Sequence, residues 1–284
     1  MDILRELAQS RKYTLHSHTQ FCDGRAPMQN FVVEAIKEGF THYGFSPHSP
    51  VPLESPCNMS MDDVPAYLAE VDRLRDAYGD RIKLYAAMEI DYLGPQWGPS
   101  NEYFVGLPLD YRIGSVHFIP TQDGELIDID GSADRFKVNM AYKFRDDIRY
   151  VVETFFNASA AMLEAGGFDI MGHFDKVAQN ASAYMPGIED KQWFMSLADS
   201  LVDLICERKP IVEINTKAKV IHGRIFPSER YLPRLIDAGV PIVVNSDAHV
   251  PALINASRDY GFELIDKLSN TTSHASRYAV ATKA

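Results

Sequence analysis

The sequence is poor in cysteine and has no long apolar run. Three cysteines at irregular spacing, Cys22, Cys57 and Cys206, rule out a disulfide framework and predict free thiols in a reducing compartment. No pair of them forms a Cys-x-x-Cys metal knuckle. No apolar stretch approaches the roughly 20 residues that a membrane span needs, and the first residues lack the apolar core of a signal peptide. We therefore expect a soluble, cytoplasmic protein that does not engage a membrane.

Basic residues are also scarce, and several familiar motifs are missing. The chain carries 28 Lys and Arg against 39 Asp and Glu, a net charge of −11, which argues against long nucleic acid as a partner. This balance leaves a small phosphorylated substrate open, because bound divalent ions invert the local charge. The sequence has no phosphate-binding glycine loop and no Gly-x-Ser-x-Gly. Nothing in it fixes an oligomeric state.

Short apolar, β-branched runs alternate with longer amphipathic stretches. This alternation predicts a parallel α/β sheet with crossover helices, and about seven units in 284 residues favour a barrel over an open sheet. We expect one domain over residues 1–284, with a polar tail that frays from about Ser269. The expected strands are Tyr13–His16, Tyr43–Ser46, Lys83–Glu89, Tyr111–Val116, Ile170–His173, Ile211–Asn215 and Ile242–Asn245, and the expected helices are Met28–Glu38, Asp62–Tyr78, Ala141–Ala165, Lys191–Glu207 and Glu229–Ala238.

Imidazoles and carboxylates recur where these strands end. In a barrel of this kind, residues at the carboxyl ends of the strands form the active site. Each of them alone has an ordinary structural explanation: Asp23 could simply form a turn before Gly24, and His42, which precedes its strand, is expected to be structural. Together they predict a site for two or three divalent ions such as Zn, Mn or Fe. The candidate ligands are His16, His18, Asp23, His48, Glu89, His117, His173, Asp247 and His249.

The motifs HSH followed by CDG, SPH, ME-x-DY, IGSVHF, GHFD, EIN and NSDAH resemble those of the PHP (polymerase and histidinol phosphatase) superfamily. YGFSPHSPVP, CNMSM and GSVHFI resemble its monofunctional histidinol-phosphate phosphatases. The matches run in order from Tyr13 to His249. The resemblance implies a distorted (β/α)7 barrel, similar to a TIM barrel, with a trinuclear metal site at the carboxyl ends of the strands.

The resemblance also implies ligand sets and a reaction. One ion would take His16, His18, Glu89 and Asp247, a second would share Glu89 and add His117 and His173, and a third would take Asp23, His48 and His249. Some relatives have histidine where Asp23 stands. The implied reaction is the hydrolysis of L-histidinol phosphate to L-histidinol and phosphate, a step of histidine biosynthesis, by in-line attack of a hydroxide held by the metals.

Further residues are candidates for contacts with this substrate. Arg224 is the first candidate for binding phosphate, because arginine contacts phosphate in a bidentate manner, and Asp247 is a candidate for relaying a proton to the leaving group. Lys176 and Lys217 are weaker candidates for phosphate, with a solvated lysine as the alternative. Asn215, His222 and Asp91 complete the proposed substrate contacts.

Two other classes of function stay open. A PHP-type nucleotide phosphoesterase or nuclease would use the same metal site. A binding or regulatory module that has lost its activity is the second alternative, and the full set of ligands argues against it.

Overall fold

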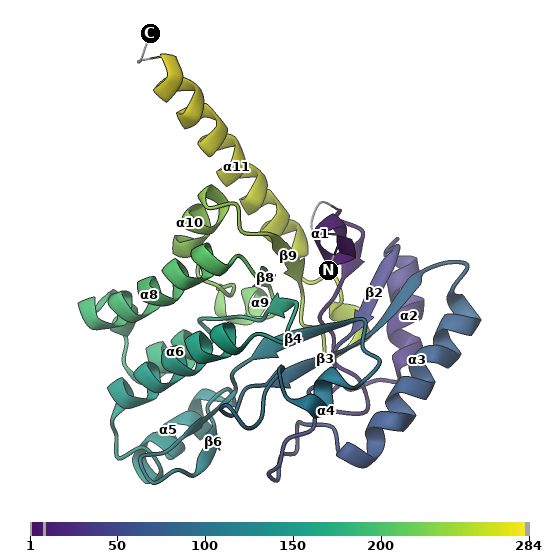
Figure 1. Cartoon of the computed structure of the whole chain (residues 1–284), viewed down its shortest axis with the longest axis horizontal. Helices are drawn as coiled ribbons and strands as arrows, with labels where there is room; N and C mark the ends of the chain where they lie inside the picture. Colours follow the sequence, from purple (N-terminus) through teal and green to yellow (C-terminus); the bar gives the residue numbers. More distant parts are fainter. Residues whose placement is uncertain (1, 8–9, 282–284) are drawn as a thin grey trace.

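A parallel sheet of seven strands curves into a nearly closed barrel with helices around it (Figure 1). The computed structural model describes residues 2–7 and 10–281 of the chain. The strand order is β1-β2-β3-β4-β7-β8-β9, and every pair of neighbours is parallel. The strands are β1 (Tyr13–Thr14), β2 (His42–Phe45), β3 (Lys83–Asp91), β4 (Tyr111–Ser115), β7 (Ile170–Met171), β8 (Ile211–Asn215) and β9 (Ile242–Asn245). The predicted (β/α)7 barrel is thereby confirmed, with each strand inside or within two residues of its expected range.

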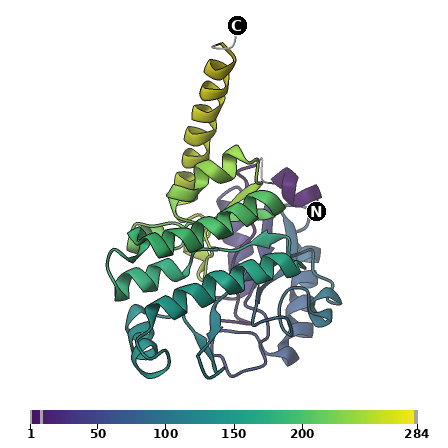
Figure 2. The ribbon, with the colours of Figure 1, turned by 60° about the vertical axis from the view of Figure 1, so that its left-hand side comes forward.

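The helices cover the outside of the barrel. Figure 2 shows two long helices, α6 and α8, lying side by side across one flank. The α-helices are α1 (Asp2–Leu7), α2 (Met28–Lys37), α3 (Val64–Tyr78), α4 (Glu102–Val105), α5 (Ala133–Tyr142), α6 (Ile148–Ala165), α7 (Val177–Tyr184), α8 (Gln192–Arg208), α9 (Lys219–His222), α10 (Leu232–Asp237) and α11 (Arg258–Ala281). Short 3₁₀ helices span Met61–Asp63, Ile188–Asp190, Glu229–Tyr231 and Pro251–Leu253. In the described ranges, no helix is both long and apolar enough to cross a bilayer.

The elements differ from the sequence-based expectations in three places. The single helix expected over Ala141–Ala165 is divided, because Arg145 and Asp146 adopt positive φ and the Asp147 side chain caps a new helix, α6. A two-stranded antiparallel hairpin, β5 (Phe118–Pro120) with β6 (Leu126–Asp128), was not expected. The stretch from Ser269, expected to be a polar tail, is part of α11, which continues to Ala281 and projects from the barrel (Figure 1). The expected tail also includes residues 282–284, which lie outside the described residues.

Side chains close the barrel between β9 and β1, which share no strand ladder. Backbone contact is limited to the stretch after the strands, where His18 N–H donates to the Ala248 carbonyl at 2.9 Å. Further back, Val244 N–H donates to the Tyr13 hydroxyl at 2.8 Å. The buried Arg258 guanidinium donates to the carbonyls of Tyr13 and Val244, one on each side of the gap. These contacts set the distance between the carboxyl ends of the first and last strands.

Candidate metal centre

The predicted ligands meet in one place because their strands are parallel and all end at the same rim of the barrel. A cavity of about 560 Å³ opens at this rim. Its wall includes Asp23, His48, His117, Asp247 and His249. His42 lies at the other end of β2, where its ring stacks on Tyr85, which fits the structural role expected for it.

Glu89 is the centre of the cluster. Its side chain is 1% exposed, and it lies two residues before the end of β3, opposite Ile113 of β4 on one side and His48 on the other. One carboxylate oxygen, Oε1, lies 2.8 Å from His173 Nε2 and 3.5 Å from His117 Nε2. The other oxygen, Oε2, lies 3.2 Å from both His16 Nε2 and His48 Nδ1. One carboxylate therefore faces imidazoles that follow four different strands.

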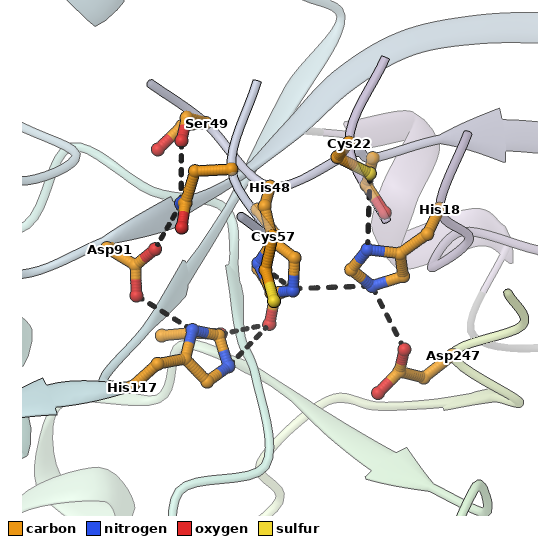
Figure 3. Close-up of polar contacts among 12 residues, drawn as sticks. His18, Cys22, His48, Ser49, Cys57, Asp91, His117 and Asp247 are labelled. Atoms are coloured by element: carbon orange, nitrogen blue, oxygen red, sulfur yellow. Dashed lines mark hydrogen bonds and ion pairs between the residues drawn. The ribbon is translucent and has the colours of Figure 1, made fainter. Parts of the chain in front are cut away.

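A second group forms around His18. Its Nε2 lies 3.0 Å from Asp247 Oδ1 (Figure 3), and its Nδ1 lies 3.2 Å from Asp23 Oδ1. The His249 ring stacks on His18 with centroids 3.9 Å apart. Asp247 adopts φ of +51°, a strained conformation for an aspartate, and such strain is concentrated at functional sites.

These side chains form three groups, and within each group the donor atoms lie within 4.8 Å of one another. The groups, drawn from the described residues, are His18, Asp23, His48 and His249; His16, His18 and Asp247; and His48, Glu89 and His117. Four of the donor atoms are buried without a hydrogen-bond partner: His16 Nε2, His18 Nε2, His48 Nδ1 and Asp23 Oδ1. Unpaired buried polar atoms are costly, so a donor set of imidazoles and carboxylates with orphaned atoms fits divalent cations.

The grouping differs in part from the ligand sets that the resemblance implied. His18 belongs to two groups, and His48 lies with Glu89 and His117 as well as with Asp23. His173 joins none of the three groups and instead forms a hydrogen bond with Glu89. The local sequence could not show this, because the side chains converge from different strands.

Two buried carboxylates behind the cluster orient its histidines. Glu213 Oε1 lies 2.7 Å from His16 Nδ1, and Asp91 Oδ1 lies 2.7 Å from His117 Nδ1 (Figure 3). A carboxylate on Nδ1 leaves Nε2 free to bind a metal and makes it a better ligand. Asp91 also accepts a hydrogen bond from the Asn58 amide at 3.0 Å. Both Asp91 oxygens are therefore engaged by side chains of the protein, while Asp91, predicted as a substrate contact, also lines the cavity.

The carboxylates of the cluster are ionised. Burial raises the pKa of Glu89, but the charges of His16, His117 and His48 outweigh burial and hold that pKa well below its usual range. Burial likewise opposes ionisation of Asp247, and Lys217 and His16 outweigh it and lower the pKa. Asp247 therefore fits the role of a metal ligand, and an ionised carboxylate has no proton to relay to the leaving group.

Three of the predicted substrate contacts lie at the cavity, and two do not. Asp91, Lys176 and His222 line it, although Asp91 is engaged as described. Arg224 is absent from the cavity wall, because its guanidinium forms a two-point ion pair with Glu189, both distances being 3.2 Å. Asn215 is also absent from the wall and is 1% exposed, with its amide bonded to Glu213 and Asp247. The structure therefore places the side chains of Arg224 and Asn215, both predicted as substrate contacts, away from the cavity wall.

Sequence reasoning underrated or missed three features of this site. Lys217 was ranked low, yet its Nζ lies 3.3 Å from Asp247 Oδ1 and 3.2 Å from His249 Nε2. Glu213 stood inside the EIN motif without being given a role. The hairpin residue Asp128 lines the cavity, and the Asp-Gly pair at 123–124 between two β-rich runs was the signal for that hairpin.

The barrel and its cluster define a class of protein: an α/β barrel that holds divalent metals at the carboxyl ends of its strands. Within this class the chain belongs to the PHP domain family, whose model matches residues 14–217.

Curated relatives of similar length match most of the chain. A probable histidinol-phosphatase of Schizosaccharomyces pombe is 25% identical over 282 residues, covering 90% of this chain and 87% of that protein. A histidinol-phosphatase of Bacillus subtilis is 22% identical and covers 82% of this chain and 92% of that protein.

Solved structures share the fold. A putative histidinol phosphatase of Listeria monocytogenes superposes with a TM-score of 0.77 at 20% identity, covering 88% of this chain and 99% of that one. A histidinol phosphate phosphatase of Lactococcus lactis, solved with Zn, L-histidinol and phosphate, gives a TM-score of 0.67 at 20% identity, covering 91% and 94%.

Proposed function

We propose that this protein is a histidinol-phosphatase, a metal-dependent enzyme that hydrolyses L-histidinol phosphate to L-histidinol and phosphate. The observation that carries the proposal is the cluster of buried imidazoles and ionised carboxylates around Glu89, with orphaned donor atoms facing one another. Membership of the PHP family and curated relatives of that activity over most of the chain support it. The Lactococcus structure, which contains both products, supports the same substrate.

We further propose that the cofactors are two or three divalent ions, of Zn, Mn or Fe. Their ligands would come from the three groups described above, with Glu89 at the centre. When bound, such ions lower the pKa of a coordinated water and offset charge on the phosphoryl oxygens. The residues of this chain hold the donors in place: Glu213 fixes the ring of His16, and Asp91 fixes that of His117.

Lys217 takes the phosphate-binding role first considered for Arg224. Its Nζ lies at the rim of the cluster, within 3.3 Å of Asp247 and 3.2 Å of His249. Burial lowers the pKa of Lys217, but Asp247, Asp130 and Asp23 outweigh it and raise the pKa, so the side chain is cationic. A cation here can contact the oxygens of a phosphate bound at the cluster and offset their charge.

Phosphate release from metal-analysed protein tests this function. We expect histidinol phosphate to be hydrolysed faster than a 3′,5′-bisphosphonucleotide and other monoesters. Chelation should abolish turnover, and added Zn or Mn should restore it. Preference for the nucleotide, or full turnover after verified removal of metal, would refute the proposal.

A pair of histidine variants completes the test. His117→Asn removes a donor of the cluster, and we expect bound metal and turnover to fall about 100-fold or more. His42→Asn is the matched control, since His42 lies at the far end of the barrel and its replacement should change neither. Full activity with full metal content in His117→Asn contradicts the assignment of this site.

A further inference from the structure

Asp128 lies on the wall of the active-site cavity, at the end of β6. The segment that follows the hairpin, with Asp130, Gly131 and Ser132, lines the same wall. The cavity thus has two acidic regions: the metal cluster at the strand ends and a separate one on the hairpin. The carboxylates of the cluster have a proposed role as metal ligands or as partners of the histidines, whereas Asp128 has no role in the proposed function.

The other aspartates that line the cavity have close cationic or imidazole partners. Asp130 lies 2.9 Å from Lys176 Nζ, so this pair is neutral as a whole. Asp23, Asp91 and Asp247 all lie within 3.2 Å of an imidazole nitrogen, at 3.2, 2.7 and 3.0 Å. Asp128 is therefore the exception among these five carboxylates of the wall.

The contacts of Asp128 leave one of its oxygens free to bind. Oδ1 accepts the backbone N–H of Asp130 at 2.8 Å. Oδ2 lies 3.8 Å from Arg135 Nη1, which is too long for a hydrogen bond, and the Arg135 side chain is 53% exposed. The Asp128 side chain itself is only 18% exposed. This largely buried carboxylate therefore has an exposed arginine 3.8 Å away as its ion-pair partner, but no cation within hydrogen-bond distance of Oδ2.

The electrostatics of Asp128 agree with its contacts. Burial is the main cause that raises its pKa, and the charge of Asp130 adds to it, while the Asp130 N–H, His117 and Arg135 oppose the shift. A cation that enters the cavity and donates a hydrogen bond to Oδ2 would stabilise the ionised form further. Lys176 does not fill this place, because its ammonium group is held by Asp130 and lies over the Phe226 ring.

We propose that Asp128 binds the ammonium group of the substrate and thereby selects phosphate monoesters that carry an amine. The inference rests on the proposed function, which places phosphate at the metal cluster of the same cavity. Histidinol phosphate carries phosphate at one end and an ammonium and an imidazole at the other. The cavity is lined both by His48, His117 and Asp247 of the metal cluster and by Asp128 of the hairpin, so it offers groups for the anionic and the cationic end of such a substrate.

The test compares amine-bearing and uncharged monoesters on the metal-loaded enzyme. For the wild type we expect a clear preference in kcat/KM for phosphoethanolamine over ethyl phosphate, and a lower KM for histidinol phosphate than for glycerol phosphate. In Asp128→Asn, KM for the two amine substrates should rise about tenfold or more, as expected for the loss of one charge-assisted hydrogen bond. The constants for ethyl phosphate and glycerol phosphate should stay within about twofold.

Asp123→Asn is the matched control. Asp123 belongs to the turn of the same hairpin, is 77% exposed and pairs with Arg145, so its replacement should leave all four substrates unchanged. Equal losses for charged and uncharged substrates in Asp128→Asn, with metal content intact, would show a structural role and overturn the proposal. Unchanged constants for the amine substrates would overturn it as well.

The test separates this proposal from the proposed function. Failure of the wild type to hydrolyse histidinol phosphate refutes the function. The comparison of phosphoethanolamine with ethyl phosphate then still decides whether Asp128 selects amines.

Discussion

Replacing Glu213 with glutamine tests whether a buried carboxylate prepares His16 for metal. Glu213 is fully buried on β8. Its Oε1 accepts hydrogen bonds from His16 Nδ1 at 2.7 Å and from the Asn245 amide at 2.9 Å. Its Oε2 accepts one from the Asn215 amide at 3.1 Å. Glu213→Gln preserves the size of the side chain and removes its charge, so that the effect of the carboxylate on His16 can be measured.

The magnitude follows from this geometry. Partners that orient a metal-bound histidine are worth about 10- to 100-fold in metal affinity, or about 1.4 to 2.8 kcal/mol. The glutamine also places an NH₂ group where Asn215 now donates, so one of the two amides must turn. We therefore expect Zn affinity to fall by about 100-fold, the upper part of that range.

Competition with a chromogenic chelator measures Zn affinity directly, and metal-free melting temperatures report on the fold. Glu153→Gln is the matched control, because Glu153 is 38% exposed and pairs with Arg149 on the surface of α6. We expect no change in Zn affinity for that control. If Glu213→Gln bound Zn as tightly as the wild type, Glu213 would not prepare His16, and the reasoning would be refuted.

The barrel seam carries two further predictions. Arg258→Met should lower the free energy of unfolding, measured by urea titration, by about 2–4 kcal/mol, because the buried carbonyls of Tyr13 and Val244 lose their donor. The control Arg73→Met breaks an exposed ion pair on α3 and should change the free energy of unfolding by less than about 0.5 kcal/mol. Equal losses in the two variants would contradict the role of the seam. Burial raises the pKa of Tyr13 to about 12, above its ordinary value of 10. The stabilisation from this shift is complete below pH 10 and is lost as pH rises through about 12. Because one pKa unit is worth about 1.4 kcal/mol, Tyr13 alone accounts for about 2.7 kcal/mol. Urea unfolding across this range should show the decline, and Tyr13→Phe should make it shallower; an unchanged slope would argue against the assignment to Tyr13.

Much of the barrel was predictable from local sequence. Apolar runs bounded by glycine and polar residues located the seven barrel strands. Gly39 and Gly239, which follow helices, adopt the positive φ that favours glycine. The Ser60 side chain caps the helical turn Met61–Asp63. These features depend on a few neighbouring residues, so a short window of sequence contains their cause.

The structure differs from the sequence-based expectations where a distant residue decides which contacts a side chain makes. Arg224 is a good phosphate ligand by type, but Glu189, 35 residues earlier in the chain, engages its guanidinium. The local sequence around Lys217 is typical of a solvated lysine, but the pairing of β8 with β9 brings its ammonium group next to Asp247 and His249. Arginine and lysine side chains are long enough to reach several partners, and local sequence does not say which partner is near.

The sequence by itself determined the type of fold and which histidines and carboxylates gather at the rim of the barrel. Parallel strands end at a common rim, so a histidine or carboxylate after each strand is brought to the same place whatever the loops do. Only the tertiary structure decided how these side chains share their contacts: Glu89 at the centre, Glu213 and Asp91 behind the histidines, and Asp128 with no cation closer than Arg135 at 3.8 Å. Those relations depend on distances of a few ångströms between atoms from different strands, which the order of residues along the chain does not contain.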